Sequence, residues 1–152
     1  MEKIYQLIGQ IIENSQYIEW NLALILRCNT ILKEFERTNS IPLSRFENVL
    51  QEADELADEL SRMTLGEIIH RVKEIERLRG EDIEQLERVL RTRNYLVHQY
   101  FKKHNIEEEK QDANFINNEV KYLETILQKM YEVNSVLVEI INFEQAQLST
   151  IR

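Results

Sequence analysis

The stretch EKIYQLIGQIIENSQYIEWNLALILRCNTILKEFE, residues 2–36, carries mostly apolar side chains at steps of three and four residues. The repeating positions are Ile4, Leu7, Ile8, Ile11, Ser15, Ile18, Leu22, Ile25, Leu26 and Leu32. Because an α-helix turns once in about 3.6 residues, this spacing places all of them on one face. The stretch therefore predicts a single long amphipathic helix, and Gly9 is its weakest point.

A second stretch of the same kind closes the chain, from about Phe115 to Leu148. Its apolar positions are Ile116, Val120, Leu123, Leu127, Met130, Val133, Leu137 and Ile141, again three or four residues apart. Two helices of more than thirty residues each therefore flank the middle of the chain.

The first break falls in the sequence RTNSIPLS, residues 37–44. Pro42 cannot continue a helix and disfavours the helical conformation of the residue before it. Ser44 followed three residues later by Glu47 is the spacing of a capping box, which predicts that a helix over 45–60 starts there.

Thr64 and Glu67 repeat that spacing and predict a third helix, which we expect to stop near Gly80 as a C-terminal cap. Apolar residues continue at helical spacing from Asp82 to Phe101 and predict a fourth helix. The polar sequence at 102–114 is then expected to form a loop.

Composition favours one all-α domain over residues 1–152, an up-and-down bundle of about five helices. Of 152 residues, 43% are hydrophobic, which is enough for one core, and only three Gly and one Pro interrupt the helix formers. Cys28 is the single cysteine and cannot form an intramolecular disulfide. No secretory signal pattern and no apolar stretch of about 20 residues is present, so we expect a soluble cytoplasmic protein without a membrane segment.

Charge is uneven along the chain, although its net value is −8. The segment from Arg88 to His104 has no acid and five basic residues, Arg88, Arg91, Arg93, Lys102 and Lys103. The segment 47–60 has six acids and no base, and we interpret it as a solvated helix face. A net acidic protein is a poor general nucleic-acid binder, but a local basic segment can still bind a phosphate group.

The basic segment contains RTRNYLVHQYF, residues 91–101, which concentrates groups suited to phosphate chemistry. Asn94 and His98 are four residues apart and share a helix face, and Arg93 and Tyr100, seven apart, share a neighbouring one. Arginine offers a planar, permanently charged fork of donors, and histidine has the unperturbed side-chain pKa nearest neutrality. Metal-free RNA cleavage needs such a proton acceptor and such a cation, and two copies of the helix would supply more groups than one.

Ordinary structural roles would also account for these residues. Arg93 is a suitable ion-pair partner for Glu19 on the first helix, which lies beside Trp20. The aromatic residues of the motif fit a packing role, and His70 and His104 fit partly buried or plain surface positions.

The arrangement of Arg93, four residues and then His98, with Asn94 directly after the arginine, resembles the signature of the HEPN superfamily of small all-α domains. The segments YIEWNL (17–22), MTLGEII (63–69) and RNYLVHQYF (93–101) extend the resemblance to stand-alone bacterial HEPN proteins over most of the chain.

The resemblance implies a metal-independent endoribonuclease without a cofactor, a toxin or phage-defence component that acts as a homodimer with a composite active site. It makes Arg93 and His98 catalytic and Asn94 a supporting residue. In HEPN toxins paired with a separate nucleotidyltransferase antitoxin, the antitoxin adds AMP to a tyrosine two residues after the histidine, which corresponds to Tyr100. We expect the phenol of Tyr100 to be exposed beside Arg93.

Two other functions stay open. The first is a non-catalytic HEPN-like module that binds a nucleotide or a partner through the basic segment, with Arg88, Arg91, Lys102 and Lys103 as anion-binding residues. The second is a plain helical scaffold whose long first and last helices form an oligomer.

Overall fold

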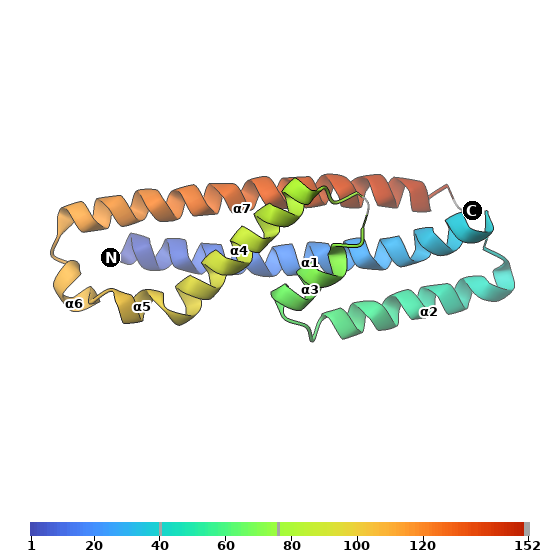
Figure 1. Ribbon diagram of the computed structural model, residues 1–152, viewed down its shortest axis with the longest axis horizontal. Coiled ribbons are helices and arrows are strands. Elements are labelled where there is room, and N and C mark those ends of the chain that lie inside the picture. The colour runs from blue at the N-terminus through green and yellow to red at the C-terminus, as the bar shows by residue number, and fades with distance from the viewer. Residues whose placement is uncertain (40, 76, 151–152) are drawn as a thin grey trace.

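Two long antiparallel helices form the frame of the molecule. The computed structural model describes residues 1–39, 41–75 and 77–150. Helix α1 (Glu2–Thr38) and helix α7 (Ala113–Leu148) lie side by side along almost the whole length of the molecule (Figure 1). The described residues form helices and no strand, so the all-α prediction is confirmed.

The shorter helices lie along one side of this frame (Figure 1). Helix α2 (Leu43–Leu60) packs back along α1, helix α3 (Leu65–Val72) follows it, and helix α4 (Gly80–His98) crosses the long pair obliquely. Two single turns, α5 (Tyr100–Lys103) and α6 (Ile106–Glu109), lead into α7 at one end of the molecule.

The apolar stripes of α1 and α7 form the main core. The buried residues are apolar ones between Ile4 and Leu26 on α1 and between Leu123 and Ile141 on α7. They pack together with apolar residues of α3 and α4. Hydrophobic burial along these stripes explains why two long helices that have few other constraints stay paired. A smaller cluster of Ile31, Val49 and Ala53 attaches α2 to α1.

The predicted start of the second helix is wrong by two residues. Pro42 is the N-cap of α2, and its carbonyl accepts hydrogen bonds from the backbone N–H groups of Arg45 and Phe46. No side-chain cap is formed, because Ser44 already lies inside the first turn of the helix. A helix can follow the proline directly, since the first N–H groups of a helix have no partner within it.

The second predicted cap is confirmed, but the end of its helix is not. Thr64 and Glu67 form the capping box, in which the Thr64 backbone N–H donates to a Glu67 carboxylate oxygen at 2.7 Å. Helix α3 already ends at Val72, because the chain then turns to bury Ile75 and Leu78 in the core. The predicted C-cap at Gly80 is wrong, since Gly80 has no positive φ and begins α4.

The predicted fourth helix is interrupted. The backbone of Gln99 departs from helical values, with φ −126° and ψ −27°, and separates α4 from α5. The segment 102–114, predicted as a loop, contains the end of α5, the single turn α6 and the first residues of α7. Asp112 caps α7 by accepting from the backbone N–H groups of Asn114 and Phe115.

Candidate active site

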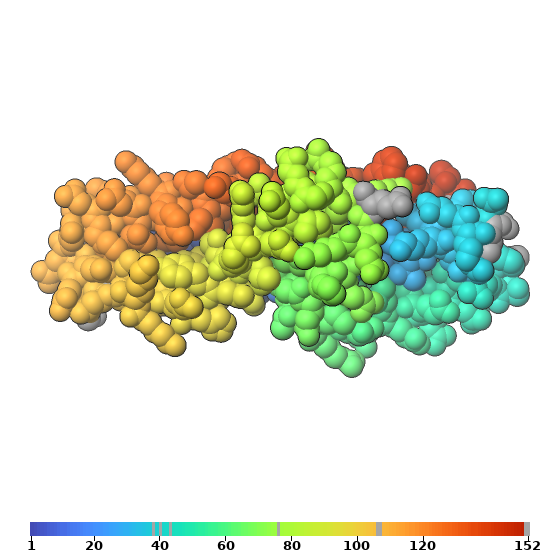
Figure 2. All heavy atoms as spheres, viewed as in Figure 1, coloured from blue at the N-terminus to red at the C-terminus, as the bar shows by residue number. Residues whose placement is uncertain are grey.

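The polar motif lies on the last turns of α4, in the region coloured yellow in Figure 2. Asn94 and His98 are both exposed and stand one helical turn apart, as their spacing predicts. His98 makes no hydrogen bond or ion pair with any residue that the structure describes. Its imidazole is therefore open to a ligand from solvent.

Arg93 lies between this exposed face and α1. Its guanidinium Nη2 atom is 4.0 Å from the Glu19 Oε1 atom, and the two side chains are 28% and 26% exposed. Nη1 donates a long hydrogen bond of 3.4 Å to the Asn94 amide oxygen. The structure thus brings Arg93 and Asn94 together, and the expected pairing of Arg93 with Glu19 is present.

The electrostatics of this pair are unbalanced. Burial raises the pKa of the Glu19 carboxyl group, and the charge of Arg93 only partly offsets that effect. The Nε atom of Arg93 is buried and has no hydrogen-bond partner. Since the Arg93 side chain is still 28% exposed, its guanidinium can donate to an anionic oxygen as a further partner.

Tyr100 is placed elsewhere, and the expectation of an exposed phenol beside Arg93 is wrong. Its side chain is 0% exposed, and its hydroxyl donates to the Glu119 Oε2 atom of α7 at 2.8 Å. Burial, followed by this hydrogen bond and the charge of Glu119, raises the pKa of the phenol far above its usual range. The break at Gln99 rotates Tyr100 out of the helical register that the sequence implied and into the core.

The residues predicted to bind anions precede Arg93 or follow His98 in the chain. Arg88 and Arg91 are exposed on α4, and Lys102 and Lys103 are exposed on α5. His104 turns inward, where its Nδ1 atom lies 3.1 Å from Glu109 and its ring packs between those of Tyr100 and Phe115. His70 is exposed on α3, so both histidines occupy positions of the expected kinds.

Sequence reasoning missed an apolar surface beside the motif. Val97 and Phe101 are exposed next to His98, and the ring of Phe101 stacks on exposed Tyr5 of α1 with ring centroids 5.7 Å apart. Exposed aromatic residues grouped in this way are typical of surfaces that bind a partner. Their helical spacing had suggested ordinary packing.

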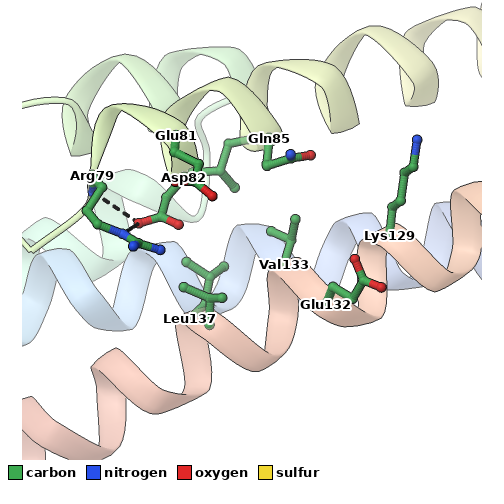
Figure 3. A pocket seen from close by; sticks show the side chains of 10 residues that line it. Arg79, Glu81, Asp82, Gln85, Lys129, Glu132, Val133 and Leu137 are labelled. Atoms are coloured by element: carbon green, nitrogen blue, oxygen red, sulfur yellow. Dashed lines mark hydrogen bonds and ion pairs between the residues drawn. The ribbon is translucent and has the colours of Figure 1, made fainter.

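Other hollows of the surface lie outside the motif. In the one shown in Figure 3, Arg79, Asp82 and Gln85 at the start of α4 face α7, and Arg79 is joined to Asp82. It contains none of the predicted site residues. A larger hollow between α1 and the corner of α2 and α3 includes Glu19, the partner of Arg93.

In comparisons with known proteins, no family model, no curated protein and no solved structure matches the chain. Among the described residues, no cluster of three or more His, Cys, Asp or Glu side chains could hold a metal ion. Within that same part of the chain, no helix is apolar over enough residues to span a membrane.

Proposed function

We propose that this protein is an endoribonuclease of the HEPN type, a toxin or phage-defence component that cleaves RNA without a metal ion. The observation that carries the proposal is that Asn94 and His98 are exposed one turn apart at the end of α4, where Arg93 is hydrogen-bonded to Asn94. The partly exposed guanidinium of Arg93 and the open imidazole of His98 suit a substrate that brings a phosphate and a hydroxyl together.

In this reaction the 2′-oxygen of a ribose attacks the adjacent phosphorus atom. His98 takes the 2′-hydroxyl proton, and Arg93 stabilises the negative charge that develops on the phosphoryl oxygens. The bond from phosphorus to the 5′-oxygen breaks, and that oxygen gains a proton from a second acid. The products are a 2′,3′-cyclic phosphate and a 5′-hydroxyl.

The second acid is the reason to propose a dimer. One α4 carries a single histidine of this kind, and a second copy facing the first would provide its own protonated His98 for the leaving oxygen. The exposed apolar residues Val97 and Phe101 beside His98 support this arrangement, because a second copy would remove them from water.

The proposal includes a separate nucleotidyltransferase chain as antitoxin, with Tyr100 as the acceptor of AMP. Since the Tyr100 hydroxyl is buried and bonded to Glu119, transfer to it requires α5 to separate from α7. A bulky anion added there would prevent the segment from closing again.

The test is cleavage of single-stranded RNA by purified protein with EDTA present. We expect His98→Ala and Arg93→Ala each to lower the rate by roughly 10²-fold or more, the usual contribution of a general base or a charge-stabilising donor. Arg93→Lys is expected to fail as well, because an ammonium group lacks the planar fork. His70→Ala, which removes an exposed histidine of α3, is the matched control.

Circular dichroism would establish that each variant keeps its helices. If the parent protein cleaves no RNA with or without added metal ions, the enzyme proposal is wrong. Cleavage that survives both alanine substitutions would contradict the assignment of the site.

A second candidate function is a non-catalytic module that binds nucleotides or other anions. The pairing of Arg93 with Glu19 favours it, because that carboxylate neutralises part of the charge a catalytic arginine needs. In that case the parent would bind a nucleotide without cleaving RNA, and binding would weaken on replacing Arg88, Arg91, Lys102 or Lys103.

A further inference from the structure

The hollow between α1 and the corner of α2 and α3 has an exposed tryptophan in its wall. Its volume is about 320 Å³, within the range of small-ligand sites of about 300–1,000 Å³. Trp20 of α1 lines it and is 64% exposed, the largest exposed fraction among the big apolar side chains that the structure describes. A tryptophan left this open loses the favourable free energy of burying its indole ring.

The remaining walls combine apolar and polar groups. Leu60 and Ile68, both buried, contribute to the apolar surface together with half-buried Met63. Gln16 and Glu19, on the same stretch of α1 as Trp20, add an amide and a carboxylate. A flat aromatic ligand with hydrogen-bonding groups along one edge matches these walls better than an aliphatic one.

The hollow adjoins the candidate active site through Glu19. Glu19 lines it, and the Oε1 atom of Glu19 lies 4.0 Å from the Nη2 atom of Arg93. A phosphate bound at Arg93 would therefore lie beside one wall of this hollow. A nucleotide suits such neighbouring places, because its base and phosphate are joined through one sugar.

We propose that this hollow binds a guanine base of single-stranded RNA, stacked on Trp20, next to the phosphate bound by Arg93. The inference rests on the function proposed above. Stacking on an aromatic side chain and hydrogen bonding along the base edge are how proteins bind unpaired bases. When ionised, the Glu19 carboxylate can accept hydrogen bonds but cannot donate them. Guanine is the base that offers it two adjacent donors, N1–H and the N2 amino group.

The chain offers a direct measurement, because Trp20 is its only tryptophan. Full-length His98→Ala protein, expected to bind RNA without cleaving it, would be titrated with labelled decamers of uridine that do or do not contain one central guanosine. Anisotropy of the label gives the affinity, and Trp20 emission reports stacking. We expect the guanosine decamer to bind roughly tenfold more tightly and to quench Trp20.

Three substitutions in the His98→Ala background sharpen the test. Trp20→Ala should lower affinity for the guanosine decamer by roughly 5- to 100-fold, the usual effect of removing a stacking side chain. Glu19→Gln should reduce the preference for guanosine while quenching by bound RNA persists. Tyr131→Ala, which removes an exposed aromatic ring from α7, is the control and should leave binding unchanged.

The two proposals fail in distinguishable ways. If the parent protein cleaves RNA but Trp20→Ala leaves the affinity of the His98→Ala protein for the guanosine decamer unchanged, the base site is wrong and the nuclease proposal stands. If the parent does not cleave RNA and His98→Ala does not bind it, both are wrong. Emission of Trp20 that changes with protein concentration but not with RNA would assign this surface to a second copy of the chain and overturn the base site.

Discussion

At the scale of single residues, Glu144 on α7 is a buried acid whose ionisation affects the free energy of folding. Its side chain is 0% exposed, and neither carboxylate oxygen has a hydrogen-bond partner. Arg77 lies 3.9 Å away, stacks over the ring of Phe143 and donates to Gln147. Burial raises the pKa of Glu144 to about 7, although the charge of Arg77 acts in the opposite direction.

This shift predicts how the free energy of unfolding depends on pH. The folded pKa of about 7 exceeds the unfolded value of about 4.3, so the folded state holds the proton more tightly. The contribution of Glu144 is therefore fully present below about pH 4 and is lost as pH rises through 7. Relative to the parent, Glu144→Gln should gain on the order of 2–3 kcal/mol between pH 5 and pH 8.

Urea unfolding at several pH values would measure the difference between the two proteins. Glu139→Gln, at an exposed glutamate of the same helix, is the control and should follow the parent. Parallel curves for Glu144→Gln and the parent from pH 5 to pH 8 would show that Glu144 is already charged in the folded protein.

At the scale of secondary-structure elements, α3 depends on its cap. The helix has only eight residues, yet it buries Leu65, Ile68, Ile69 and Val72. A helix this short is not stable alone and relies on its ends and on tertiary packing. The Thr64 and Glu67 side chains satisfy backbone N–H groups at its start, and their hydrogen bonds lower the pKa of the Glu67 carboxyl group.

Removing the cap tests this dependence. Thr64→Ala should lower the free energy of unfolding by about 1 kcal/mol, because the N–H of Glu67 loses its side-chain acceptor. Thr64→Ser keeps the hydroxyl and should restore most of the loss. Denaturant titration of the three proteins is the measurement, and an equal loss in both variants would mean that the Thr64 methyl group, rather than the cap, stabilises α3.

At the scale of the whole molecule, we expect a homodimer formed through the apolar surface beside His98. Phe101→Glu should dissociate it, because a carboxylate would replace an exposed ring at the centre of that surface, next to Tyr5. Val138→Glu, an equally exposed apolar position on α7, should not. Light scattering at micromolar concentration distinguishes the outcomes, and a monomeric parent protein would remove the basis for a composite site.

The sequence by itself was sufficient for the helical class, the two long amphipathic helices, the Thr64 cap and the shared helix face of Asn94 and His98. Each depends on local periodicity or on groups three or four residues apart, which a regular helix brings together whatever surrounds it. The pairing of Arg93 with Glu19 was also expected from the sequence, because Glu19 lies beside Trp20 on the first helix.

Only the tertiary structure decided where helices end and which way side chains near those ends point. Burial of Ile75 and Leu78 ends α3 well before Gly80, and the turn at Gln99 carries Tyr100 into the core against Glu119. The open indole of Trp20 beside Glu19 likewise depends on the corner of α2 and α3 that meets α1 there. These features arise between segments distant in sequence, where the free energy of burying side chains outweighs local helical periodicity.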